Sequence, residues 1–116
     1  MSPLTSTPLT TPILFIVFNR PLPTAQVFAA IRRAKPTRLY LCADGPRVDS
    51  LDDRGLCQSV REILTAIDWD CQVSERFSET NKGCRENVRS ALDWFFSRED
   101  RGIILEDDCL ASASFF

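Results

Sequence analysis

The chain has 116 residues, of which 44% are hydrophobic, a size that allows one domain with one core and excludes two. Its 14 basic and 16 acidic side chains give a net charge of -2, without the basic excess that a long nucleic acid partner requires. No histidine occurs, which excludes Ser-His-Asp and Cys-His nucleophiles as well as His-ligated zinc and haem sites.

The first twelve residues differ in composition from the rest of the chain. They contain six Ser or Thr and three Pro, and such a segment buries too little apolar surface to offset the entropy cost of ordering. We therefore expect a disordered tail over residues 1 to 11 and a single folded domain over residues 12 to 116.

Four short apolar runs follow the tail and predict four β-strands. They are Ile13 to Phe18, Arg38 to Ala43, Cys71 to Phe77 and Gly102 to Leu105. The first and the last are continuously apolar, which is typical of strands covered on both faces. Each gap between successive runs leaves room for one helix.

Apolar residues at helical spacing occupy each of these gaps. The stripes are Val27, Phe28 and Ile31 in the first; Leu56, Val60, Ile63, Leu64 and Ile67 in the second; and Cys84, Val88, Ala91, Leu92, Phe95 and Phe96 in the third. Thr24 is expected to cap the first helix, which should end before Pro36. Alternating strands and helices imply right-handed crossovers and a mostly parallel sheet, so we predict a three-layer α/β/α, Rossmann-like fold.

The cysteines bear on the compartment in which the protein works. Their number is odd and they form no C-x-x-C pair, so we interpret them as buried free thiols in a reducing environment. They are Cys42, Cys57, Cys71, Cys84 and Cys109. No apolar run is long enough to span a bilayer and no signal-peptide pattern opens the chain, so we expect a cytoplasmic protein without a membrane span.

All four predicted strands run into polar residues, and the carboxyl ends of parallel strands meet at one edge of a sheet. These residues are Asn19 and Arg20; Asp44; Asn81, Lys82 and Gly83; and Glu106, Asp107 and Asp108. Three successive carboxylates after a buried strand repel one another, and a divalent cation would relieve that repulsion. Oxygen ligands at this density suit Mg²⁺ or Mn²⁺, with positions left open for substrate phosphates.

Each of these groups also has a purely structural interpretation. The acidic run can be a solvated loop, and Asn19 and Arg20 can lead into the first helix with a surface arginine. Asp44 with Gly45 can form a turn, and Asn81 or Ser78 can cap the third helix. Trp69 and Trp94 are interpreted as packing residues. The glycine motifs of dinucleotide-binding and P-loop proteins are absent from the sequence.

Three segments of the sequence form a recognisable set: Pro12 to Pro21 (PILFIVFNRP), Ala43 to Gly45, and Ile103 to Leu110 (IILEDDCL) followed by Phe115 and Phe116. The set resembles the nucleotide-binding half of GT-A fold glycosyltransferases, in particular the N-acetylglucosaminyltransferase I type and its bacterial relatives. The resemblance covers residues 12 to 116, and its acidic segment is the most specific part.

The resemblance implies a role for each polar group. A nucleoside diphosphate sugar, with a UDP-sugar the first choice, would be bound by Asn19, Arg20, Asp44, Lys82, Glu106 and Asp107. The acidic trio corresponds to the D-x-D motif of that family, in which Asp108 would ligate Mn²⁺ or Mg²⁺ between the two phosphates. The catalytic base of inverting members lies well downstream of this motif, so the sequence names no catalytic residue.

Phe116 follows Asp108 by eight residues, and we therefore expect a segment truncated after the acidic motif, which binds the donor but transfers no sugar by itself. Two other functions remain open. One is a non-catalytic interaction module, or remnant, that pairs its last strand, Phe115 and Phe116 with a partner chain. The other is a Mg²⁺-dependent phosphohydrolase.

Overall fold

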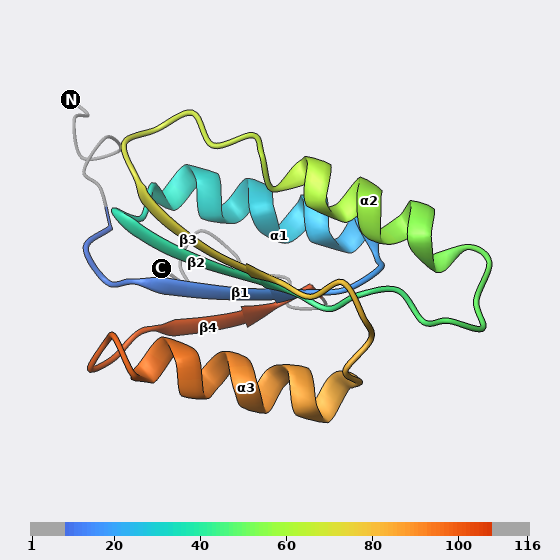
Figure 1. The fold of residues 1–116 in the computed structure, drawn as a ribbon. Coiled ribbons are helices and arrows are strands. Elements are labelled where there is room, and N and C mark those ends of the chain that lie inside the picture. Colours follow the sequence, from blue (N-terminus) through green and yellow to red (C-terminus); the bar gives the residue numbers. More distant parts are fainter. Residues whose placement is uncertain (1–8, 108–116) are drawn as a thin grey trace.

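A computed structural model describes residues 9–107, which form a parallel β-sheet with helices on both faces (Figure 1). The elements are β1 (Ile13–Val17), α1 (Pro21–Ala34), β2 (Arg38–Ala43), α2 (Asp53–Ile63), β3 (Gln72–Phe77), α3 (Cys84–Phe96) and β4 (Ile103–Glu106). The four strands lie in the order β3-β2-β1-β4, and every neighbouring pair is parallel. The predicted three-layer α/β/α, Rossmann-like fold is confirmed.

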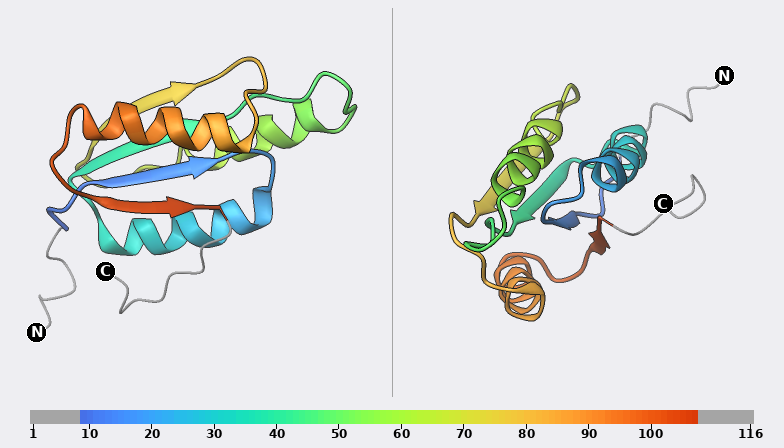
Figure 2. Two further views of the ribbon diagram at one scale, coloured as in Figure 1. Left: turned by 90° about the horizontal axis from the view of Figure 1, so that it is seen from below. Right: turned by 90° about the vertical axis from the view of Figure 1, so that its right-hand side faces the viewer.

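The order of the strands explains how the helices are distributed. The chain moves from β1 to β2 to β3 in one direction and then returns to the far side of β1 to form β4. Because such crossovers are right-handed, α1 and α2 cover one face of the sheet and α3 covers the other, as Figures 1 and 2 show. The reversal of direction creates a switch point between β1 and β4, where open α/β sheets bind their ligands.

The core lies on both faces of the two central strands. Every residue of β1 is buried, as is β2 from Leu39 onward. The two strands are aligned with Ile13 opposite Leu39. β4, in contrast, lies at the edge of the described sheet and only Leu105 in it is buried. The expectation that the last strand is covered on both faces is confirmed in part: Ile103 and Leu105 pack against the core on one face and Ile104 against the core on the other, but Ile103 and Ile104 stay half-buried at the edge.

The first helix starts earlier than the sequence indicated. Arg20 is the N-cap residue and Pro21 occupies the first turn, where a missing N–H costs nothing. Thr24, the predicted cap, is buried inside the helix instead. The helix ends before Pro36 as predicted, with Lys35 in the left-handed conformation (φ 52°) and its N–H donating to the Ile31 carbonyl at 3.0 Å.

The predicted apolar stripes of the second and third helices are confirmed at most positions and wrong at three. Val60, Leu64, Ala91 and Phe95 are buried, and Ile63, Ile67, Val88 and Leu92 pack against the core. The buried residues are Asp53, Cys57 and Val60 in α2 and Asn87, Ala91 and Phe95 in α3. Leu56 and Phe96, both assigned to the core from their spacing, are exposed, and so is Cys84. Each helix carries apolar residues on more than one side, so contact with the sheet decides which side is buried.

The cysteine and tryptophan predictions are confirmed in part. Cys42 and Cys57 are buried and Cys71 is half-buried; these thiols and that of Cys84 are free. Trp69 and Trp94 are packing residues as predicted, with ring centroids 6.2 Å from Phe28 and 5.3 Å from Tyr40, respectively. Cys109 lies outside the described residues.

Residues 9 to 12, which precede β1, make backbone hydrogen bonds to the folded domain. Leu9 donates its N–H to the Lys35 carbonyl at 3.1 Å, and the Pro12 carbonyl accepts from the Ile103 N–H at 2.9 Å, so residues 9 to 12 run beside the fold.

Within residues 9–107, no helix has the length and apolar character needed to cross a bilayer.

Candidate functional site

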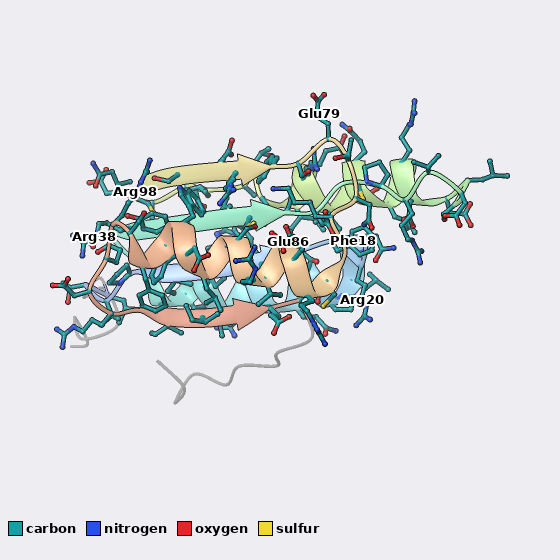
Figure 3. The ribbon with its side chains drawn as sticks, turned by 60° about the horizontal axis from the view of Figure 1, so that its bottom comes forward. Phe18, Arg20, Arg38, Glu79, Glu86 and Arg98 are labelled. Atoms are coloured by element: carbon teal, nitrogen blue, oxygen red, sulfur yellow. The ribbon has the colours of Figure 1, made fainter. Side chains whose placement is uncertain are left out.

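A cavity of about 410 Å³ opens where the strands end, at the switch point between β1 and β4. Its lining residues come from four segments of the chain: Ile16, Val17, Phe18 and Arg20; Asp44 and Arg47; Asn81, Gly83, Cys84, Asn87 and Val88; and Glu106 and Asp107. Figure 3 labels Phe18 and Arg20 at this end of the sheet, where α3 begins. A volume of this size lies within the ~300–1,000 Å³ range of small-molecule sites.

Four of the predicted site residues border this one cavity: Arg20, Asp44, Glu106 and Asp107. They come from the ends of β1, β2 and β4, which confirms the expectation that polar residues after the strands converge at one edge. The topology explains the convergence, because parallel strands all deliver their carboxyl ends to the same side.

The other three predicted residues are placed differently. Asn19 does not line the cavity; its Nδ2 donates to Oδ1 of Asp53 at 2.9 Å. Lys82 lines a separate, smaller cavity of about 250 Å³ between β3 and α3. Asp108, the predicted metal ligand, lies outside the described residues, as do Phe115 and Phe116.

Arg20 brings positive charge to the cavity. Arg20 is exposed and lies three residues after β1, at the N-cap of α1. Among residues 9–107, no carboxylate lies within salt-bridge distance of its guanidinium. Within this part of the chain, the planar donor fork of Arg20 is therefore available to an anionic ligand such as a phosphate.

Arg47 is held at the cavity wall by Asp53, a contact that the sequence did not reveal. Its Nε and Nη2 donate to the Asp53 carboxylate at 2.7 and 3.0 Å, and its backbone N–H donates to the same group at 2.9 Å. These hydrogen bonds, with a further one from Asn19, hold the pKa of Asp53 well below its usual range. The Arg47 guanidinium also lies 5.7 Å from the centroid of the Phe18 ring.

Asp44 is buried, with 2% of its surface exposed, and its carboxylate accepts four hydrogen bonds. Oδ1 accepts from the N–H groups of Gly45 and Lys82 at 2.9 and 2.8 Å. Oδ2 accepts from the Gly83 N–H and from Asn81 Nδ2, both at 3.2 Å. The residues that lead into α3 are thereby attached to the end of β2.

The N-terminus of α3 is not capped as the sequence indicated. The N-cap residue is Gly83, with φ 88°, a conformation that favours glycine. Asn81, one predicted cap, instead donates to Asp44 and to the Gly45 carbonyl. Ser78, the other, donates to the Thr80 carbonyl at 2.6 Å. Both side chains therefore stabilise the loop before the helix, because the helix begins at Cys84 and Gly83 occupies the N-cap position.

Asn87 is a cavity residue that the sequence analysis missed. It is 5% exposed, lies on the buried face of α3 and lines the cavity. Its Oδ1 accepts from the Cys42 thiol at 3.6 Å, so the amide nitrogen is the part of the side chain that can donate to a ligand. Burial raises the pKa of the Cys42 thiol and keeps it protonated as the donor. The sequence contained a signal for this residue, because Asn87 is a polar side chain four residues before Ala91, on the same face of the helix as the apolar stripe.

Glu106 and Asp107 form the acidic side of the cavity. Both are half-buried, and Glu106 lies opposite Ile16 in the sheet. Residues 9–107 contain no group of three or more side chains placed to hold a metal ion. The predicted metal site includes Asp108, beyond this range, so it stays a prediction.

Comparison of the chain with protein-family models, with curated proteins and with solved structures found no match. The fold and the composition of the cavity are therefore the observations on which a function can be argued.

Proposed function

We propose that the chain is the nucleotide-binding half of a GT-A type glycosyltransferase, and that it binds a nucleoside diphosphate sugar, preferably a UDP-sugar, together with Mn²⁺ or Mg²⁺. The observation that carries this proposal is that Arg20 and the pair Glu106 and Asp107 border one cavity at the switch point of the sheet. The sequence resemblance implies that these residues bind the nucleoside diphosphate sugar.

The mixture of charges in the cavity supports a phosphate ligand accompanied by a cation. Carboxylates such as Glu106 and Asp107 repel a diphosphate unless a metal ion lies between the carboxylates and the phosphates. Asp108, the next residue in the chain, is the ligand we propose for that ion. A bound divalent cation would neutralise the charge that develops on the departing diphosphate, and Arg20 would bind a phosphate oxygen directly.

The apolar part of the cavity supports a planar ligand group beside the charged one. Phe18 and Val88 lie in the lining, and Arg47 is stacked over the Phe18 ring. Asn87 adds an amide N–H group that can donate a hydrogen bond to a carbonyl oxygen of a base or sugar. A nucleotide sugar has both kinds of group.

The test is thermal unfolding of the chain with UDP, GDP or ADP, each with and without Mn²⁺. At one hundred times Kd, a ligand of the native state alone adds about 2.7 kcal/mol, which raises Tm by on the order of 10 °C in a domain of this size. We expect UDP to require the metal. Asp108→Asn should abolish most of the shift, whereas Asp70→Asn, which removes an exposed carboxylate before β3, should leave it unchanged.

If none of the three nucleotides with Mn²⁺ moves Tm in a cooperatively unfolding sample, the proposal is wrong. The alternative is then an interaction module, favoured by the position of β4 at the edge of the described sheet, where Ile103 and Ile104 are half-buried. Sedimentation velocity over a range of concentrations would detect the self-association that this alternative predicts.

A further inference from the structure

The buried carboxylate of Asp44 has no acceptor position left for a ligand. An ionised carboxylate offers about four lone-pair sites. Four donors occupy them: the N–H groups of Gly45, Lys82 and Gly83, and Asn81 Nδ2. With 2% of its surface exposed, Asp44 is in the wall of the cavity without presenting a free oxygen to it.

The loop that supplies these donors is also packed against the backbone of β2's end. A Cβ added to Gly45 would lie 2.7 Å from backbone atoms of Glu79 and Thr80, so only glycine permits this approach. The Gly45 carbonyl accepts from Asn81 Nδ2 at 3.0 Å. The loop is therefore held through its backbone as well as through the carboxylate.

Arg61 of α2 secures the same junction from the other side. Its Nη2 donates to the Ser78 carbonyl at 2.6 Å and to the Asp44 carbonyl at 3.3 Å. The guanidinium lies 5.1 Å from the centroid of the Phe77 ring. The end of β2, the end of β3 and α2 thus meet at Asp44.

This junction leads directly into the cavity wall. Gly83, whose N–H donates to Asp44, is the N-cap residue of α3. The following helix residues Cys84, Asn87 and Val88 line the cavity. A displacement of residues 81 to 83 would therefore move the side of the cavity that carries the Asn87 amide.

We propose that Asp44 is a positioning residue of the nucleotide site, which fixes residues 81 to 83 and the first turn of α3 and does not contact the nucleotide itself. This inference rests on the proposed function, and it replaces the direct contact with the nucleotide that the sequence resemblance implies for Asp44. Its consequence is that the Asp44 carboxylate does not discriminate among bases.

The first experiment measures amide hydrogen exchange in the absence of nucleotide. Asp44→Asn substitutes an NH₂ donor for one of the two oxygens, so at least one backbone donor loses its acceptor. We expect the amides of Lys82 and Gly83 to exchange about tenfold faster or more, the factor that corresponds to losing one charge-assisted hydrogen bond. Amides of β1 should exchange at the wild-type rate. Unchanged exchange at Lys82 and Gly83 overturns the inference, whatever the chain binds.

The second experiment compares the binding of UDP, CDP and GDP with Mn²⁺. A positioning role predicts that Asp44→Asn weakens all three by the same factor, and that Asn81→Ala, which keeps the carboxylate but removes its side-chain donor, does so to a smaller extent. A direct contact with the base predicts instead that Asp44→Asn changes the order of preference among the three nucleotides while Asn81→Ala has no effect, and this result overturns the inference.

Asn81→Ala and Gly45→Ala keep the inference testable if Asp44→Asn does not fold. Gly45→Ala retains the Asp44 carboxylate, but its added Cβ forces residues 79 and 80 away from the end of β2. This variant should therefore reproduce the faster amide exchange and the weaker, base-independent nucleotide binding. Wild-type behaviour of both variants would contradict the inference. If the wild-type chain binds no nucleoside diphosphate, the proposed function fails, while the exchange experiment still decides whether Asp44 holds the loop.

Discussion

Arg47 and Asp53 form a bidentate salt bridge in which the carboxylate is almost fully buried and the guanidinium half-exposed, with Nε to Oδ2 at 2.7 Å. Asn19, two residues after β1, donates to the same carboxylate. One side chain at the start of α2 therefore connects the end of β1 with the loop after β2. This connection holds Arg47 beside Phe18 at the cavity.

Asp53 should make the stability of the protein depend on pH in the acid range. Its pKa is lowered in the folded state, chiefly by the side-chain and backbone hydrogen bonds from Arg47, whereas the unfolded value is about 3.9. The folded state therefore binds fewer protons, so this contribution is complete above the unfolded pKa and is lost as pH falls below it.

The measurement is urea unfolding of the wild type and of Asp53→Asn at pH 7, 5 and 3. We expect the variant to be less stable at pH 7 and to lose less stability than the wild type between pH 5 and pH 3. Asp49→Asn, in the loop before α2 and exposed, is the matched control and should follow the wild type. An equal loss in wild type and Asp53→Asn would contradict this assignment.

Two glycines should respond to alanine substitution in opposite directions. A Cβ at Gly102 would lie 2.2 Å from Cζ of the buried Phe95 ring and 2.9 Å from the Pro12 carbonyl oxygen. Gly102→Ala should therefore destabilise the fold by about 1–3 kcal/mol, the usual cost of overpacking a core.

Gly55 lies in α2 with no atom within 4 Å of an added Cβ. Gly55→Ala should stabilise the chain by up to about 1 kcal/mol, because alanine loses less backbone entropy in a helix. Chemical unfolding of the two variants beside the wild type tests both values. A destabilised Gly55→Ala variant would mean that the α2 surface is covered.

Arg20 should contribute to nucleotide affinity more than an arginine elsewhere on α1. Hydrogen bonds to a charged group contribute about 1.5–3 kcal/mol, so Arg20→Ala should weaken binding of UDP with Mn²⁺ about tenfold to a hundredfold. Arg33→Ala removes an exposed arginine at the opposite end of the same helix and serves as the control. Isothermal titration calorimetry gives both constants, and equal effects of the two substitutions would count against a phosphate contact at Arg20.

The cysteines should react with a thiol reagent in an order that their environment sets. Cys84 is exposed at the start of α3 and should react first. Cys71, Cys42 and Cys57 should follow slowly, because burial raises the pKa of each thiol. The experiment uses a Cys109→Ser background, in which denaturant should expose all four remaining thiols.

Cys84 also reports on the cavity, because it belongs to the lining. UDP with Mn²⁺ should slow its labelling and leave that of Cys71 unchanged, and Cys84→Ser should remove the fast phase. Equal protection of both thiols by the nucleotide would indicate a general stabilisation rather than occupancy of this site.

The alternation of apolar runs and helical patterns was enough to predict the α/β fold, since the connectivity of parallel strands follows from local patterns and from the handedness of crossovers. The same reasoning placed Arg20, Asp44, Glu106 and Asp107 at one edge, where they border one cavity. The location of these four residues depends only on where each strand ends, and the sequence pattern shows where the strands end.

The tertiary structure decided which groups are free to act. Asn19 and Asp44 are engaged by hydrogen bonds to other segments, Lys82 lines a different cavity, and the polar Asn87 lies on the buried face of α3. The sequence determined the order of the strands along the chain and the chemistry at their ends. Hydrogen-bond partners and the rotation of a helix against the sheet depend on contacts between segments distant in sequence, so only the assembled fold determines them.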